Sequence, residues 1–256
     1  MIKVAFFDID GTILKFGYKE PSDKVVYTLN SLKEKGILLC MATGRSYPTI
    51  PHFKNIKFDI YLTFNGSYVL NKETIIRKNP LDKKDVNIII DNLNKMNRAI
   101  SIANEKIVVC NGVDDDLRQY FAFGHEEPEI VSNFKDLCQD DVYQIMCSCH
   151  KEEYETILEG TSNSKIAAWW DKAVDIIPKS GGKGAAVKDI LDYYGFSKKE
   201  AIAFGDGEND IEMFESVGTA IAMGNSNEIV KSKADEICLS VDDDGIYQYF
   251  KDHKII

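Results

Sequence analysis

The chain has 256 residues, of which 44% are hydrophobic, and its formal net charge is −10. This length fits one large domain or two modest ones with a real core, and the acidic balance argues against nucleic acid or an anionic membrane as the main partner. No apolar stretch approaches the roughly 18 residues that a membrane-spanning helix needs, and Asp8 and Asp10 interrupt any apolar signal region. Six cysteines without a C-x-x-C pair are typical of reduced thiols, so we expect a cytoplasmic location.

The first third of the chain alternates strands with helices. Its first strand, residues 2–7, is a short apolar run that ends in Asp8-Ile9-Asp10-Gly11-Thr12. The elements expected after it are a helix at 22–35, a strand at 37–41, a short helix after Thr43-Gly44-Arg45, a strand at 58–62, and a small hairpin from Asn65-Gly66 to about 78. Strands that alternate with helices indicate a parallel sheet covered on both faces.

The rhythm changes after Pro80-Leu81. Apolar residues at helical spacing predict a helix near 83–96. The segments after it are predicted as strands near 98–103 and 106–111, a helix near 114–123, a strand near 142–149, a helix near 151–160, and strands near 165–170 and 173–177. Paired strands between helices indicate an α+β unit with an antiparallel sheet. Within it, Cys147, Cys149 and His150 suggest a zinc site, but no second ligand pair has metal spacing, which favours packing for both thiols.

The alternation of strands and helices returns after Pro178. We predict helices near 183–194, 209–216, 225–232 and 243–251, and strands near 201–205, 218–222 and 235–239. The fold class is therefore α/β: a doubly wound, mostly parallel sheet in a Rossmann-like core, with an inserted α+β domain. The predicted core halves are residues 1–81 and 178–256, and the predicted insert is residues 82–177.

Four polar segments of the split domain follow strands or open a helix. They are Asp8 to Thr12, Thr43-Gly44-Arg45, Lys183, and Asp206-Gly207-Glu208-Asn209-Asp210. Ligands of an open α/β sheet bind beyond the carboxyl ends of its strands, so the four segments are expected to converge. Carboxylates without His or Cys suit a hard cation such as Mg²⁺, and Thr43, Gly44 and Lys183 are suited to holding a phosphoryl group beside it.

Taken singly, these residues have simpler interpretations. Thr43 is typical of a helix cap, Lys183 of a solvated first-turn lysine, and Asp206 of a turn; only their joint occurrence favours a site. Residues 181–184 match a P-loop in part, but Lys183 is followed by Gly184 rather than Ser or Thr. None of the four histidines lies in a motif, so His52, His125, His150 and His253 are interpreted as surface residues.

The set resembles the haloacid dehalogenase-like phosphohydrolases, and the insertion after the third strand resembles the Cof-type branch with a type IIB cap. The resemblance covers nearly the whole chain. It rests on Asp8-Ile-Asp-Gly-Thr12, Met41-Ala-Thr-Gly-Arg45, Asn65-Gly66, Gly182-Lys-Gly184, Gly205-Asp-Gly-Glu-Asn-Asp210 and Ala222-Met-Gly-Asn225. The stretch from Asp114 to Asp140 is trimmed relative to larger members, which leaves the choice of substrate open.

The resemblance implies a role for each residue. Asp8 would be the nucleophile, with its other oxygen on Mg²⁺, and Asp10 the general acid and base, with its backbone carbonyl on the metal. Asp206 would bind the metal directly, whereas Thr12 and Asp210 would lie one layer further out, Asp210 acting through water or by orienting Lys183. The phosphoryl group would be held by Thr43, Gly44, Lys183 and Asn209. Substrate contacts would come from Arg45, Asn65 and cap residues near Trp169-Trp170 and Asp171.

The resemblance therefore predicts a Mg²⁺-dependent phosphomonoesterase that acts on a small phosphorylated metabolite, such as a sugar phosphate. Two alternatives stay open. A phosphomutase would carry the same motifs and return the phosphoryl group to substrate, and a catalytically silent module would bind a phosphorylated ligand without turnover. The oligomeric state is not predicted.

Overall fold

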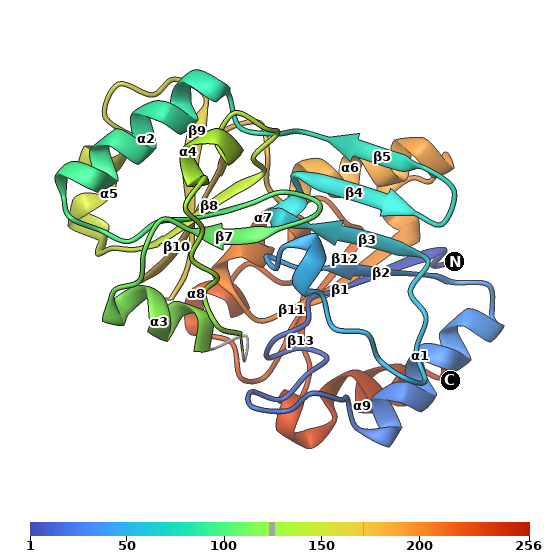
Figure 1. Ribbon diagram of the computed structural model, residues 1–256. Helices are drawn as coiled ribbons and strands as arrows, with labels where there is room; N and C mark the ends of the chain where they lie inside the picture. Colours follow the sequence, from blue (N-terminus) through green and yellow to red (C-terminus); the bar gives the residue numbers. More distant parts are fainter. Residues whose placement is uncertain (123–125, 171) are drawn as a thin grey trace.

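The computed structural model describes residues 1–122, 126–170 and 172–256, and it contains two separate β-sheets (Figure 1). The larger sheet has the strand order β13-β12-β11-β1-β2-β3-β4-β5, and it is parallel from β13 to β3. Its strands are β1 (Val4–Phe7), β2 (Leu38–Ala42), β3 (Ile60–Thr63), β4 (Tyr68–Asn71), β5 (Ile75–Lys78), β11 (Ala201–Gly205), β12 (Thr219–Ala222) and β13 (Glu236–Ile237). The hairpin strands β4 and β5 extend it in antiparallel fashion.

Strand β1 shows why helices cover both faces of this sheet. Its successive side chains point to opposite faces, and all four residues are fully buried. Phe7 packs on the face that holds α1 (Asp23–Glu34) and α9 (Gly245–Asp252), whereas Phe6 packs on the face that holds α6 (Lys183–Tyr194), α7 (Ile211–Phe214) and α8 (Glu228–Lys231). Burying each phenylalanine stabilises the fold by about 1.5–3 kcal/mol. The predicted doubly wound α/β core is confirmed.

The smaller sheet is antiparallel, with the order β7-β6-β8-β10-β9. Its strands are β6 (Ser101–Ala103), β7 (Val108–Cys110), β8 (Gln144–Ser148), β9 (Ser164–Trp170) and β10 (Ala173–Pro178). Helices α2 (Lys83–Lys95) and α5 (Tyr154–Leu158) pack on one face through a shared apolar cluster. Cys147 and Cys149 are buried in that cluster, as the packing interpretation predicts.

Strands of the larger sheet come from both sides of this segment in the sequence, as an insertion requires. The boundaries at residues 81/82 and 177/178 remain a prediction; the first falls between β5 and α2, and the second lies one residue before the end of β10. A separate cluster joins the two sheets: Tyr68 of β4 and Phe64, in the turn after β3, pack with Met146 of β8 and Tyr143, just before β8.

Several predicted helices are shorter than their apolar patterns. The helix expected at 209–216 is a 3₁₀ turn over Glu208–Asp210 followed by α7, because the Asp210 carboxylate accepts the backbone N–H groups of residues 206 and 207 and holds a tight turn. The helix expected at 225–232 begins at residue 228, where the Asn227 side chain caps it. The helix after Arg45 is a 3₁₀ turn over Tyr47–Thr49.

Two further differences lie around the smaller sheet. The helix predicted at 151–160 divides into a 3₁₀ turn over Lys151–Glu153 and α5, because the Glu153 side chain folds back to accept the His150 backbone N–H. Helix α4 (Phe134–Leu137) was not predicted, since four residues are too short to show a helical period; α3 (Asp115–Ala122) matches its expected place. No helix in the described parts of the chain is long and apolar enough to cross a membrane.

Candidate active site

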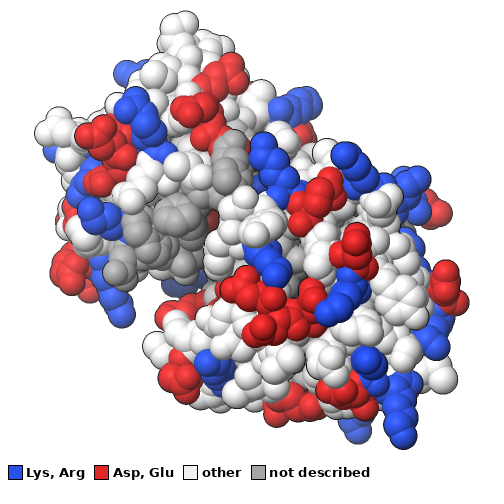
Figure 2. Space-filling view, turned by 90° about the horizontal axis from the view of Figure 1, so that it is seen from below, with Lys and Arg blue, Asp and Glu red and all other residues white. Residues whose placement is uncertain are grey.

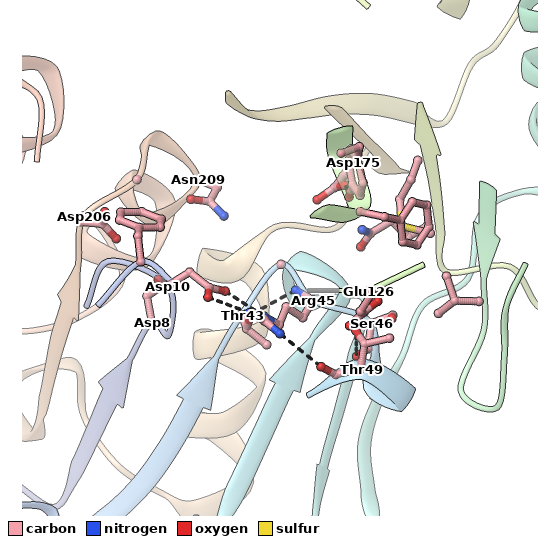
Figure 3. Close-up of a pocket in the computed structure, with 18 residues that line it drawn as sticks. Asp8, Asp10, Thr43, Arg45, Ser46, Thr49, Glu126, Asp175, Asp206 and Asn209 are labelled. Atoms are coloured by element: carbon pink, nitrogen blue, oxygen red, sulfur yellow. Dashed lines mark hydrogen bonds and ion pairs between the residues drawn. The ribbon is translucent and has the colours of Figure 1, made fainter. Parts of the chain in front are cut away.

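The four polar segments meet at the carboxyl edge of the larger sheet, and Figure 3 shows residues from three of them, Asp8 with Asp10, Thr43 with Arg45, and Asp206 with Asn209. Asp8 and Asp10 follow β1, Thr43 to Arg45 follow β2, Asp206 to Asp210 follow β11, and Lys183 is the first residue of α6. Parallel pairing of β1 with both β2 and β11 aligns these strand ends. The convergence therefore follows from the strand order.

Lys183 is the centre of the site. Its side chain is fully buried, and its Nζ donates to Asp8 Oδ1 at 2.7 Å and to Asp210 Oδ1 at 2.6 Å. Burial lowers the pKa of Lys183, but attraction to Asp210 and Asp8 outweighs this and holds the pKa above its ordinary value. Lys183 is thus a buried cation between two carboxylates, not a solvated surface lysine.

Asp206 stands beside this pair. Its Oδ1 accepts from Thr12 Oγ1 at 3.1 Å, and its Oδ2 accepts from Asn225 Nδ2 at 3.2 Å. The backbone after β1 packs so closely against Asp206 that it leaves no room for a side chain. Gly11 has φ +84°, and a Cβ there would lie 2.2 Å from Asp206 Oδ2. The glycine of the Asp-x-Asp-Gly-Thr segment therefore lets Asp206 approach the backbone after β1.

The site concentrates negative charge away from water. Burial raises the pKa of Asp8 to about 7, with repulsion from Asp210 adding to it and Lys183 opposing it. Burial also raises the pKa of Asp206 to about 8, helped by repulsion from Asp8 and Asp210. Carboxylates held this way attract a cation, because a second positive charge would relieve the repulsion.

The donor set fits a magnesium ion. Asp8, Asp206 and Asp210 each offer a carboxylate oxygen, and these oxygens lie within 4.8 Å of one another. Asp210 is already engaged through both oxygens, one by Lys183 and the other by two backbone N–H groups. This leaves Asp8 and Asp206 as the better direct ligands, and one or two carboxylates are what Mg²⁺ usually takes from a protein.

Asp10 and Arg45 form an ion pair at the edge of this cluster (Figure 3). Arg45 Nε donates to Asp10 Oδ2 at 2.8 Å, and Arg45 Nη2 donates to Asp10 Oδ1 at 2.7 Å. Both Asp10 oxygens therefore accept from the guanidinium, and a substrate oxygen must compete with it for them.

Thr43 and Gly44 line the cavity that opens over this carboxylate cluster. Thr43 is 2% exposed, and its Oγ1 accepts the backbone N–H of Arg45 at 3.0 Å, so its own hydroxyl proton remains a donor. Gly44 lies against a neighbour: a Cβ there would be 3.1 Å from the amide of Asn65.

Asn65 and Asn209 are joined to a residue that sequence reasoning missed. Asn209 Nδ2 donates to Asn65 Oδ1 at 3.0 Å, and Asn65 Nδ2 donates to Asp175 Oδ2 at 2.7 Å. Asp175, on β10, is 1% exposed and also accepts from Tyr120 at 2.5 Å. A carboxylate inside the apolar run of β10 was the available signal, because a buried Asp needs partners.

A cavity of about 190 Å³ opens between the two sheets over these residues, and Figure 2 shows the hollow between the two lobes from below. Its floor includes Asp8, Asp10 and Asp206. Its other wall comes from the segment around the smaller sheet, with Val108, Tyr120, Phe121, Gln144, Met146 and Asp175.

Some residues singled out from the sequence lie outside the described part of the structure. Trp169 and Trp170 lie on β9, and their side chains are outside the described part of the structure. Asp171 and His125 lie outside the described residues. His52, His150 and His253 are exposed.

Comparison with known proteins agrees with this geometry. Residues 5–250 match the family described as haloacid dehalogenase-like hydrolase. The chain is 26% identical to the 5-amino-6-(5-phospho-D-ribitylamino)uracil phosphatase YitU of Bacillus subtilis, over 96% of this chain and 95% of that protein.

Two solved structures are similar over almost their whole length. The HAD subclass IIB sugar phosphatase BT4131 has a TM-score of 0.89 and 27% identity, and the match covers 99% of this chain and 100% of that one. A structure from work on a trigonal-bipyramidal intermediate in a phosphoryl-transfer superfamily has a TM-score of 0.93 and 27% identity, with complete coverage of both chains. The chain belongs to the haloacid dehalogenase-like hydrolases, as a phosphatase of the Cof-type branch with a subclass IIB cap.

Proposed function

We propose that this phosphatase is a Mg²⁺-dependent phosphomonoesterase that hydrolyses a small phosphorylated metabolite through an aspartyl-phosphate on Asp8. The observation that carries the proposal is the buried Lys183, which holds Asp8 at 2.7 Å beside the Asp206 carboxylate, on the floor of a cavity. A relative named as a phosphatase of a phosphorylated ribitylamino-uracil, and a structural neighbour named as a sugar phosphatase, support a small metabolite as substrate.

The reaction divides into two displacements at phosphorus. An oxygen of Asp8 attacks phosphorus, the bond to the leaving oxygen breaks, and Asp10 gives that oxygen a proton. Asp10 then takes a proton from water, the water oxygen attacks phosphorus, and the bond to Asp8 breaks to release inorganic phosphate. Arg45 must yield the Asp10 oxygens during these proton transfers, because it engages both of them in the resting structure.

We propose that the phosphoryl oxygens are held by groups of the cavity wall together with Lys183, which is buried against Asp8. We assign this role to the Thr43 hydroxyl, the Gly44 backbone N–H, Asn209 and Lys183, and substrate contacts to Arg45 and Asn65. Phosphoryl transfer depends mostly on placement and charge stabilisation, and these groups offer both.

Asp8, Asp206 and the backbone carbonyl of Asp10 would hold Mg²⁺, with Thr12 fixing Asp206 and Asp210 fixing Lys183. When bound, the ion neutralises charge that develops on the phosphoryl oxygens. The carboxylate chemistry supports this choice, because the cluster contains neither His nor Cys.

Residues 82–177 are proposed to form the cap domain, and residues 1–81 and 178–256 the core. The cap wall of the cavity would cover the substrate and exclude water from the aspartyl-phosphate until the leaving group has left. The described cysteines are free thiols, which supports the proposal that the enzyme works in a reducing compartment such as the cytoplasm.

The test is phosphate release from a panel of phosphorylated metabolites, with and without Mg²⁺, for wild type and Asp8→Asn. We expect metal-dependent release that vanishes in the variant while its thermal unfolding remains cooperative. Release by Asp8→Asn at a rate near that of wild type would refute the nucleophile. Isomerisation of a substrate without release would indicate a mutase, and binding without either reaction a silent module.

A further inference from the structure

A continuous chain of hydrogen bonds runs from the cap to the phosphate side of the active site. Tyr120 on α3 donates to Asp175 Oδ1 at 2.5 Å, Asn65 Nδ2 donates to Asp175 Oδ2 at 2.7 Å, and Asn209 Nδ2 donates to Asn65 Oδ1 at 3.0 Å. Asp175 and Asn65 are 1% and 2% exposed. Asp175 belongs to the smaller sheet, whereas Asn65 and Asn209 follow β3 and β11 of the larger one.

The bonds in this chain have a fixed direction. A carboxylate only accepts hydrogen bonds, whereas each end of an asparagine amide has one kind of group, a donor or an acceptor. Asp175 therefore requires the Nδ2 of Asn65, which turns the Oδ1 of Asn65 toward Asn209. Because Asn65 Oδ1 is an acceptor, Asn209 must donate to it through Nδ2. The Asp175 carboxylate of the cap thus determines the orientation of the Asn209 amide next to the phosphate site.

Asn209, the last residue of this series of hydrogen bonds, lies where a phosphoryl group would bind. Asn209 lines the cavity together with Thr43 and Gly44, and a Cβ on Gly44 would come within 3.1 Å of the Asn65 amide. The Nδ2 of Asn209 carries a second N–H beyond the one it gives to Asn65. A donor in that place stabilises a phosphoryl oxygen, whereas the Oδ1 would repel it.

We propose that Asp175 is a positioning residue that sets the amide orientation of Asn65 and, through it, turns the N–H of Asn209 toward the phosphoryl group. The inference rests on the proposed function. It adds a hydrogen-bonded link by which the cap, when packed against the core, orients the donor groups of the phosphate site. Asp175 acts through other residues here, so its effect is the same for every leaving group.

The decisive variant is Asp175→Asn, which keeps the shape but allows either end of the new amide to face Asn65. We expect kcat/KM to fall by about 10- to 100-fold, the scale of losing a group that orients another residue of the site. The factor should be equal for p-nitrophenyl phosphate and a sugar phosphate, and the affinity for inorganic phosphate with Mg²⁺, measured by calorimetry, should fall as well.

The matched control exchanges the two side chains. In the double variant Asn65→Asp with Asp175→Asn, the new amide donates to the new carboxylate, which again accepts from Asn209. Asp also tolerates the left-handed backbone at position 65, where φ is +50°. We expect phosphate affinity and kcat/KM to recover to within about fivefold of wild type, a coupling that two neighbouring residues can carry. Tyr120→Phe, which leaves the Asn65 bond intact, should change kcat/KM by less than about threefold.

Three results would overturn the proposal, provided that thermal unfolding shows each variant folded: an exchanged variant no better than the single variants, a loss that depends on the leaving group, or unchanged phosphate affinity in Asp175→Asn. If wild type releases no phosphate from any substrate, the proposed function fails. The phosphate affinities of the single and exchanged variants then still decide whether Asp175 orients the site, and absence of phosphate binding in wild type would refute both.

Discussion

At the scale of single residues, the burial of Lys183 most needs a physical explanation. A fully buried lysine is costly unless it is paired, and here its cost is offset by Asp8 and Asp210 within 2.7 Å. Removing the cation leaves two buried carboxylates close together without a counter-charge. The same side chain therefore serves the fold and, in the proposed reaction, the nucleophile.

We predict that Lys183→Met abolishes detectable phosphate release or lowers kcat by at least about 100-fold, the scale for losing a preorganised charge in an active site. It should also destabilise the metal-free protein by about 3–5 kcal/mol, as breaking a buried ion pair does. Phosphate release and urea unfolding measure both. The control is Lys179→Met, because Lys179 is exposed and should change neither. Activity of Lys183→Met within tenfold of wild type would contradict the role of Lys183.

At the scale of elements, tight backbone turns bring the strand ends and the α6 N-terminus together. The turn after β3 is an example: Gly66 has φ +90°, and a Cβ there would lie 2.4 Å from the backbone oxygen of Gly182, just before Lys183. Asn65-Gly66 was expected to be a hairpin turn, and it does lead into β4. Its packing against the start of α6 joins segments more than 100 residues apart, which no local pattern could predict.

We predict that Gly66→Ala destabilises the protein by more than about 2 kcal/mol, since it combines left-handed strain with a clash against backbone. Gly195→Ala is the matched control: its φ is +66°, but its Cβ would meet nothing within 4 Å. This control should cost only about 1 kcal/mol and leave activity intact. Chemical denaturation of both variants, with phosphate-release assays, tests the difference. Equal losses in stability would show that contact with Gly182 contributes little.

At the scale of the whole molecule, the sequence was informative about the core and much less so about the cap. Periodicity and strand-end chemistry led to the doubly wound sheet, because a central strand such as β1 buries both faces and three of the four motifs follow a strand. The contact between Asp175 and Tyr120 was not predicted, because neither a lone Asp in an apolar strand nor a Tyr on a short helix indicates which residue it will contact. Their contact depends on how the two sheets pack, which is a long-range property.

The charge of the whole site predicts a link between pH and metal binding. The carboxyls of Asp8 and Asp206 have raised pKa values of about 7 and about 8, against 3.8 for an ordinary Asp. The folded chain therefore holds more protons than the unfolded chain between these limits, and the metal-free protein loses stability from these groups as pH rises through them. Mg²⁺ competes with those protons, so its stabilising effect should grow as pH rises.

We expect the rise in Tm produced by saturating Mg²⁺ to be larger at pH 8 than at pH 5. Differential scanning fluorimetry with Mg²⁺ or with chelator measures it. Asp206→Asn is the control, and it should remove most of the metal-dependent shift at both pH values. A shift that is independent of pH, or one that persists in Asp206→Asn, would contradict the proposed ligand set.

The most direct test of the central claim is a rapid acid quench during turnover, followed by mass analysis of the peptide that contains Asp8. We predict that, with Mg²⁺ present, this peptide gains the mass of one phosphoryl group on Asp8, and that the gain disappears on chelation and in Asp8→Asn. Substrate turnover in wild type without any phosphoryl group on Asp8, or with one on another residue, would contradict the mechanism.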